Sequence, residues 1–146
     1  MKEVTLQELR ERNLWRTKMG LDNQIEIKRR ADLPARAFAY FDNKHNRNLE
    51  VAYWRKCWNV RNIIMDILKV EEDNDSYTTM TVDDVDAVIK ALRKMNKKNW
   101  LDCGDTIWSW KEFKGIQRHN IRNLRHLHHM MRKQPEVFEV YFYDSW

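Results

Sequence analysis

The fold depends on residues 48–68, NLEVAYWRKCWNVRNIIMDIL. Asn48 is a favourable N-cap, and apolar side chains then recur every three or four residues, which is the helical period. These apolar positions are Leu49, Tyr53, Cys57, Val60, Ile64, Ile67 and Leu68. The pattern predicts one long amphipathic helix over the whole segment. A line beside its buried face would carry Trp54, Trp58 and Arg61.

Upstream of this segment the sequence predicts one helix and one or two short strands. Thr5 and Glu8 have the spacing of a capping box, which indicates a helix over about 6–19. Alternating apolar and polar residues favour a strand over 24–28, and a second strand is conceivable over 37–41. The intervening residues have the composition of a loop.

Downstream, strands and helices alternate. Residues 77–80 favour a strand, and the Thr81–Asp84 capping box begins a helix that extends to about residue 96. A further helix is predicted from 111 or 115 to 133, and 136–143 alternate as a strand. The chain is therefore predicted to be one α+β domain over 1–146, with about four helices and a small antiparallel sheet that includes the C-terminal strand. The expected core residues are Tyr53, Cys57, Val60, Ile64, Val85, Ile89, Leu92, Leu124 and Leu127.

Composition limits the class of protein. The chain has 146 residues, of which 42% are hydrophobic and 12% aromatic, enough for one core. Its apolar runs are far shorter than the roughly 20 residues that span a bilayer, and the N-terminus lacks an apolar signal core. Cys57 and Cys103 are too few for a disulfide framework, which fits a reducing cytoplasm. We therefore expect a soluble protein that does not act at a membrane.

Charge is unevenly distributed along a chain of net charge +5. Residues 28–61 and 111–133 are strongly basic, whereas residues 66–86 are strongly acidic. Folding could bring the two basic segments together into one face that attracts anions. The alternative is that these are solvated helix faces paired with the acidic segment.

Aromatic and basic side chains are interleaved in ways that suit a planar anion. Arginine forks match phosphate geometry, and tryptophan faces stack on bases. The candidate ligand-binding residues are Trp54, Arg55, Trp58, Arg61, Asn62, Trp108, Trp110, Tyr143 and Trp146. For each aromatic ring, packing in the core is the competing interpretation.

The sequence contains no recognisable catalytic or metal-binding motif. Only His126 and His129 share the spacing of one helix face, and no Cys-x-x-Cys or His-Glu-x-x-His pattern completes a ligand set. Glycine-rich phosphate loops and nucleophile elbows are also missing from the sequence. We therefore predict no catalytic residues, no metal and no cofactor, and a protein that is not an enzyme.

Three features resemble a family of small tailed-phage proteins. They are the box Tyr53-Trp54-Arg55-Lys56 followed by Asn62, the strand-to-helix junction at 77–84, and the aromatic ending 141–146 with Ser-Trp last. The chain departs from the family where Trp58 replaces an Asn and Arg61 replaces a His. The resemblance covers roughly the last two thirds of the chain.

The resemblance implies a phage accessory protein that acts in the host bacterial cytoplasm against host defence. Such proteins include oligomeric sponges that sequester nucleotide signals of the cyclic ADP-ribose or cyclic dinucleotide type. Because sequestration needs affinity and no transition-state machinery, this role agrees with the predicted lack of catalytic groups. The alternatives are a nucleic-acid-binding phage protein and one that blocks a host protein; a nucleotide-cleaving enzyme is a further option.

Overall fold

The structure, a computed structural model, describes residues 22–28, 48–70, 76–102, 109–135 and 137–145. The predicted helix over 6–19 and the conceivable strand over 37–41 lie outside these ranges, as do Trp108 and Trp146.

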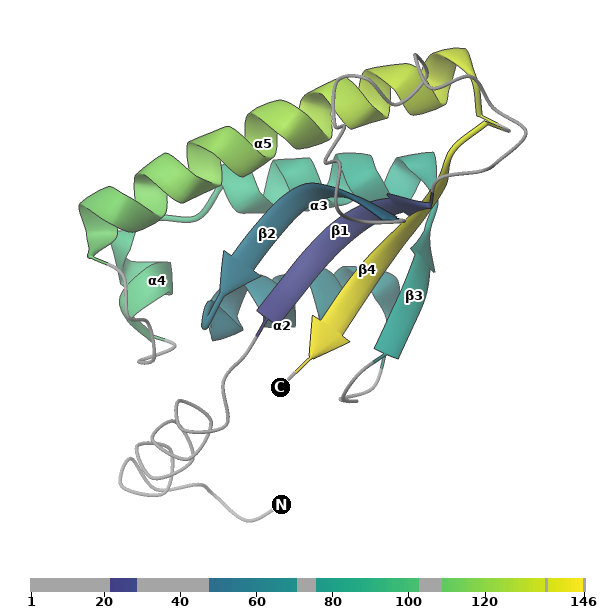
Figure 1. Cartoon of the computed structure of the whole chain (residues 1–146). Helices are drawn as coiled ribbons and strands as arrows, with labels where there is room; N and C mark the ends of the chain where they lie inside the picture. The colour runs from purple at the N-terminus through teal and green to yellow at the C-terminus, as the bar shows by residue number, and fades with distance from the viewer. Residues whose placement is uncertain (1–21, 29–47, 71–75, 103–108, 136, 146) are drawn as a thin grey trace.

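The described strands form one antiparallel sheet of four strands in the order β2-β1-β4-β3 (Figure 1). Their bounds are β1 Asp22–Lys28, β2 Asn48–Arg55, β3 Ser76–Met80 and β4 Glu139–Ser145. The C-terminal strand β4 lies between β1 and β3, so the last strand of the chain is central in the sheet. This arrangement confirms the α+β class and the predicted place of the C-terminal strand in the sheet.

The described helices are α2 Trp58–Leu68, α3 Val82–Arg93, α4 Lys97–Asp102 and α5 Trp110–Lys133. Helix α3 packs against both α2 and α5, and α5 packs against β2 (Figure 1). Asn23, Trp54 and Asp144 occupy one register row on the same face of the sheet. Since α5 contacts Trp54 and α2 contacts Asp144, both helices lie on that face.

The predicted helix over 48–68 is wrong in its first half, where residues 48–55 form β2. Tyrosine, tryptophan and valine favour strands. A bulge opposite Ile25 and Glu26 buries the neighbouring residues Val51 and Ala52 together, which breaks the alternation that would have revealed the strand. Trp54 and Trp58 therefore belong to different elements and not to one helix face.

The edge of β2 is covered by α5. The Asn120 side-chain amide donates to the Tyr53 carbonyl at 2.8 Å and accepts from the Tyr53 N–H at 3.4 Å. Asn123 donates to the Val51 carbonyl at 3.1 Å. Because exposed edge strands invite pairing with other chains, these bonds protect the edge as well as fixing the position of α5.

The predicted capping box begins α3, and α5 begins at Trp110, one residue before the earlier of its two predicted starts. Thr81 and Asp84 form the reciprocal capping box of α3, with bonds of 3.1 and 2.9 Å. Ser109 caps α5 by accepting from the Glu112 N–H at 3.1 Å. The short helix α4 was not predicted from the sequence.

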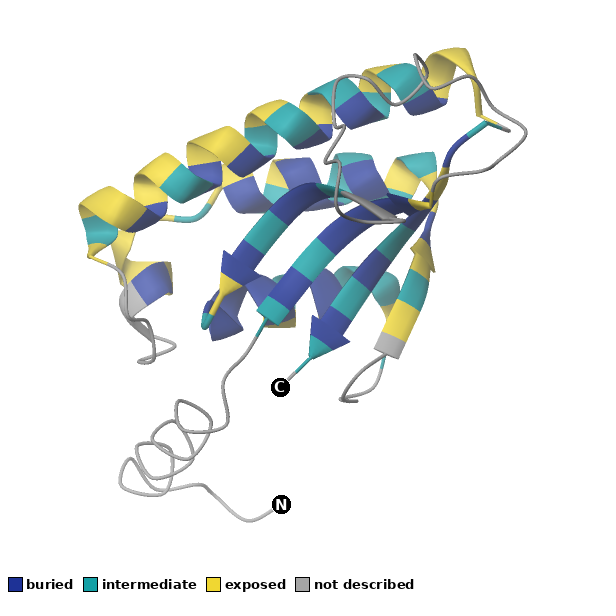
Figure 2. Cartoon of the chain, in the orientation of Figure 1, coloured by how far each residue is buried: buried dark blue, intermediate teal, exposed yellow. Residues whose placement is uncertain are grey.

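The core lies between the sheet and the helices, as the dark blue inner surfaces in Figure 2 show. Every predicted core residue is buried except Tyr53, which lies half-buried on the opposite face of the sheet. No helix within the described ranges is long and apolar enough to cross a membrane.

Candidate functional site

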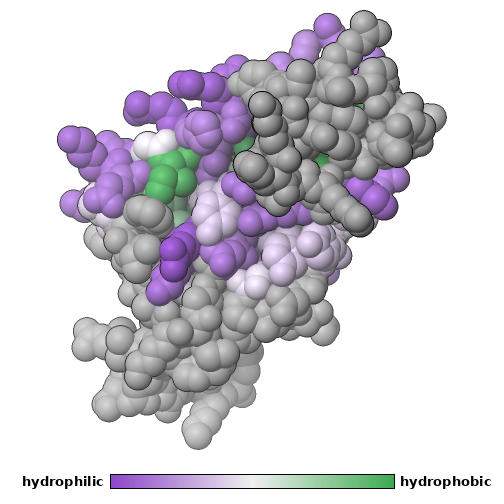
Figure 3. Space-filling model, in the orientation of Figure 1, coloured by the Kyte–Doolittle hydropathy of each residue, from purple (hydrophilic) through white to green (hydrophobic). Residues whose placement is uncertain are grey.

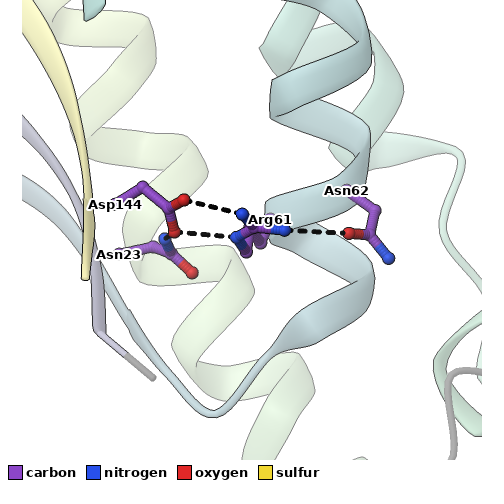
Figure 4. A network of polar contacts seen from close by, with 4 residues as sticks. All are labelled: Asn23, Arg61, Asn62 and Asp144. Atoms are coloured by element: carbon purple, nitrogen blue, oxygen red, sulfur yellow. Dashed lines mark hydrogen bonds and ion pairs between the residues drawn. The ribbon is translucent and has the colours of Figure 1, made fainter. Parts of the chain in front are cut away.

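The predicted site residue Arg61 is buried in an ion pair. Its Nε and Nη2 atoms donate to the two carboxylate oxygens of Asp144 at 2.8 and 2.7 Å (Figure 4). Asn23 Nδ2 also donates to Asp144 at 2.7 Å, and Asn62 accepts from Arg61 at 3.5 Å. Arg61 is only 2% exposed, so this fork joins α2 to β4 and does not face solvent.

The two tryptophans predicted beside Arg61 are also core residues. Trp54 is fully buried and its Nε1 donates to Gln117 Oε1 at 2.9 Å, while Trp58 is buried under the guanidinium of Arg61. Arg55 is exposed at the end of β2, next to the turn at Lys56. The structure therefore does not bring Trp54, Arg55, Trp58 and Arg61 together as walls of a surface pocket.

Tyr143 lies on the face of the sheet opposite the helices. It shares a register row with Gln24 and Tyr53, and its ring stacks on Tyr77 at 4.5 Å. Trp54 faces the other way, because adjacent residues of a strand point to opposite faces. Tyr143 and Trp54 therefore cannot line one pocket within a single chain.

A groove of about 720 Å³ runs between α3 and α5, and it contains Trp110 from the predicted set. Its apolar side chains are Leu92, Met95, Trp110, Phe113 and Ile121. Its cationic side chains are Arg93, Lys114, Arg118, Arg122 and Arg125, and His126 and His129 lie at the same end of α5 as Arg125. We refer to this feature as the α3–α5 groove.

The aromatic end of the groove is held by ring packing. Trp110 stacks on Phe113 with ring centroids 5.9 Å apart, and Trp100 lies 5.7 Å from Trp110. Lys114 Nζ lies 5.8 Å from the Trp110 centroid, a cation–π distance. This packing orients the Trp110 ring, which is half-buried and keeps part of its surface accessible.

Gln117 connects the groove to the sheet. Its Oε1 accepts from Trp54 at 2.9 Å, and its Nε2 donates to Met95 Sδ at 3.4 Å. Gln117 is buried, so both ends of its amide are used in positioning neighbouring groups. Trp54 thus supports the groove from beneath even though it does not line it.

Electrostatics give the groove a strongly positive rim. Lys114, Arg118, Arg122 and Arg125 follow one another at intervals of three or four residues, so they form a stripe along α5. None of these four, nor Arg93, forms an ion pair within the described part of the chain. Figure 3 shows hydrophilic surface along α5, interrupted by a small hydrophobic patch.

This combination can bind an anion that also has a flat apolar part. Guanidinium groups form paired bonds to phosphate or carboxylate, and an aromatic ring stacks on a planar heterocycle. The groove also has the size of a small-molecule pocket, for which volumes of about 300–1,000 Å³ are typical.

The sequence identified the basic segment and Trp110 but missed the site itself. The helical spacing of the basic residues over 114–125 is visible in the sequence and could have indicated one face of α5. The apolar wall from α3 could not be found in this way, because only the packing of α3 on α5 brings Leu92 and Met95 beside Trp110. Trp108 and Trp146 stay predictions, since they lie outside the described residues.

Within the described ranges, no group of three or more His, Cys, Asp or Glu side chains could hold a metal ion. Comparison of the whole chain with known proteins found no match among family models, curated proteins or solved structures.

Proposed function

We propose that the protein binds a phosphorylated ligand with a planar ring, a nucleotide or a nucleotide-derived signal, in the α3–α5 groove and retains it unchanged. The observation that supports this most strongly is the juxtaposition of a half-buried Trp110 ring with a stripe of arginines that have no described carboxylate partner. A guanidinium stripe without an ion-pair partner among the described residues, beside an aromatic wall, provides both recognition elements of a nucleotide.

Retention without conversion is part of the proposal. The described lining offers cations, apolar groups, one amide and the two histidines His126 and His129, but no carboxylate, hydroxyl or thiol. Histidine can act as a general acid or base in the cleavage of phosphate esters, but the lining supplies none of the carboxylates, hydroxyls or thiols that serve as nucleophiles. This supports binding without a covalent intermediate, and recovery of the intact ligand tests whether the histidines cleave it.

The biological role follows from the resemblance given above. A phage protein that holds a nucleotide would act in the bacterial host's cytoplasm, and its ligand would be an immune signal such as cyclic ADP-ribose or a cyclic dinucleotide. Sequestration would then lower the free concentration of the signal below what its effector requires.

Calorimetric titration and native mass spectrometry test the proposal. The panel is ADP, ADP-ribose, cyclic ADP-ribose, cyclic di-AMP and cyclic di-GMP, each at fixed ionic strength. We expect at least one to bind, to be recovered intact after denaturation, and to lose about tenfold or more in affinity in the double variant Arg118→Glu/Arg122→Glu.

The matched control is Lys111→Glu/Lys133→Glu. It makes the same change in net charge on exposed positions of the same helix that do not line the groove. Affinity in this control should stay within about threefold of the unmodified protein. Equal losses in both double variants would contradict a site in the groove, and recovery of a cleaved ligand would contradict retention.

A further inference from the structure

A second pocket, of about 460 Å³, lies between α2 and α3 near the start of α4. Three side-chain amides line it: Asn59 and Asn62 from α2, and Asn99 from α4. Ile63, Ala91 and Met95 supply its apolar surface. We refer to it as the amide pocket.

Asn59 carries an unused hydrogen-bond donor. The residue is only 5% exposed, and its Oδ1 accepts from the Val60 N–H at 2.9 Å. Its Nδ2 atom is buried and has no hydrogen-bond partner among the described residues. A buried donor without an acceptor destabilises the protein, so an acceptor supplied by a ligand would recover this energy.

The chemistry of the amide pocket differs from that of the α3–α5 groove. Its two charged residues, Asp66 and Lys94, carry opposite charges, whereas the charged residues of the groove are all cationic or histidine. Side-chain amides offer one donor and one acceptor at a fixed distance, which is the pattern of a nucleobase edge. The amide pocket therefore suits an uncharged heterocycle better than a phosphate.

The two pockets adjoin at Met95, which lines both. Resting on the phosphate contacts of the function proposed above, and placing the base in this second pocket instead of on Trp110, we infer that the amide pocket holds the heterocyclic base of the ligand while the α3–α5 groove holds its phosphate. The base presents an acceptor atom to Asn59 Nδ2 and packs against Ala91 and Met95. The protein thus distinguishes nucleotides from other sugar phosphates at this second pocket.

The test compares AMP, GMP, CMP and UMP with ribose 5-phosphate by calorimetry. Ribose 5-phosphate carries the same sugar and phosphate as the nucleotides but no base. We expect at least one of the four to bind about tenfold or more tightly than ribose 5-phosphate, a difference due to the base alone.

Ala91→Phe fills the amide pocket from α3 without changing charge. It should reduce that preference to about twofold or less and leave the affinity for ribose 5-phosphate unchanged. The matched control is Ala87→Phe, one helical turn earlier at a partly exposed position that lines neither pocket. The control should keep the full preference, and melting curves establish that both variants are folded.

Asn59→Asp tests the donor itself. The aspartate keeps the oxygen that accepts from Val60 and is favourable in the first turn of a helix, but it replaces the buried donor by an acceptor. It should lower the preference for the base about fivefold or more.

The possible outcomes separate the two proposals. Retention of the base preference in Ala91→Phe overturns the inference, as does equal affinity of all four nucleotides and ribose 5-phosphate. If in that second case a ligand of the first panel still binds and loses affinity in Arg118→Glu/Arg122→Glu, the proposed function stands. Failure of every nucleotide, including those of the first panel, to bind overturns both.

Discussion

At Arg61 and Asp144 two opposite charges lie in the core, with side-chain exposures of 3% and 0%. Removing charges from water costs several kcal/mol per ion, and this cost is offset only where the geometry is good and the remaining polar atoms are bonded. Here the guanidinium makes two parallel bonds to one carboxylate, and Asn23 donates a third bond to it. This ion pair therefore fixes the position of α2 relative to β4.

Loss of one partner should destabilise the fold far more than loss of both. Arg61→Met leaves the Asp144 carboxylate buried without its main partner, and we expect the free energy of unfolding to fall by about 3–5 kcal/mol. Arg61→Met/Asp144→Leu removes both charges and should recover most of that loss. Urea denaturation measures all three proteins.

The exposed pair Lys90–Asp86, 2.8 Å apart, provides the control. Because water screens both groups, Lys90→Met should leave the free energy of unfolding nearly unchanged. A double variant no more stable than Arg61→Met alone would contradict the explanation by buried charge.

The buried thiol of Cys57 should lower the free energy of unfolding at alkaline pH. Burial raises the pKa of its thiol from 9.0 to about 12. The unfolded chain therefore ionises first, and above pH 9 it binds one proton fewer than the folded chain at this position. Between the two pKa values, the free energy of unfolding should fall by about 1.4 kcal/mol per pH unit. Below pH 9 the thiol is protonated in both states, so its contribution to stability is fully present there.

Urea denaturation at several pH values between 8 and 11 should measure this slope. In Cys57→Ala the slope from this thiol should be absent, while that from Tyr53 persists, because burial and the Asp22 hydrogen bond raise the Tyr53 pKa as well. Identical pH profiles for Cys57→Ala and the unmodified protein would show that the thiol is not responsible.

At the scale of elements, the segment 48–68 shows why a helical period is not sufficient to predict a helix. Residues 58–68 form α2 as predicted, but 48–55 pair with β1. The change of direction occurs at Lys56, whose φ of 54° belongs to the left-handed region. No glycine or proline signals this turn in the sequence, so the strand could be recognised only from its pairing with β1.

Elements with local signals were predictable. The capping box at Thr81 and the alternation of β4 depend on neighbouring residues, and the structure has both. The predicted site failed where it depended on long-range packing: Arg61 pairs with Asp144, 83 positions away. A charged residue beside aromatic residues indicates a ligand site or a buried pair equally well, and only the fold decides between them.

The end of α2 offers a test at this scale. Lys69 adopts φ 55° and ψ 41°, and its N–H donates to the Asp66 carbonyl at 3.2 Å. The left-handed conformation destabilises a non-glycine residue by roughly 1–2 kcal/mol, whereas glycine adopts it without this strain. Glycine also has a larger conformational entropy in the unfolded chain, which offsets part of the gain in stability. Lys69→Gly should therefore raise the free energy of unfolding by about 0.5–1 kcal/mol, measured by urea denaturation.

The same substitution at Lys94, the C-cap of α3, is the matched control. Lys94 has φ −81° and lies in the right-handed region, where glycine gives no relief. Lys94→Gly should lower the free energy of unfolding or leave it unchanged. Stabilisation by both substitutions to a similar extent would show that backbone conformation is not the cause.

At the scale of the whole molecule, the order of the strands links the site to the end of the chain. β4 lies between β1 and β3, so these two strands belong to one sheet only because each pairs with β4. Asp144 of β4 pairs with Arg61 of α2. Trp54 of β2 donates to Gln117 of α5, and this hydrogen bond fixes the floor of the α3–α5 groove. The groove thus lies on a helix, α5, that the sheet holds in place through buried hydrogen bonds.

The salt dependence of binding affinity distinguishes a small ligand from a nucleic-acid polymer. A nucleic acid that engaged the five Lys and Arg residues of the groove would release condensed counterions, with a slope of about −0.7 to −0.9 in log affinity against log salt for each phosphate. Between 50 and 200 mM salt its affinity would fall by roughly a hundredfold or more. A nucleotide carries few phosphates and no condensed counterion layer, so its affinity should fall by less than about tenfold.

Titrations of the tightest nucleotide and of a single-stranded oligonucleotide, each over that salt range, make the comparison. If the groove holds a small ligand, the nucleotide should remain bound at 200 mM salt while the oligonucleotide is released. Arg122→Glu should weaken nucleotide binding at every salt concentration, because a paired bond to phosphate in a groove depends more on contact geometry than on long-range attraction. Tight oligonucleotide binding with a steep salt slope, together with no measurable nucleotide binding, would instead identify α5 as a surface for nucleic acid.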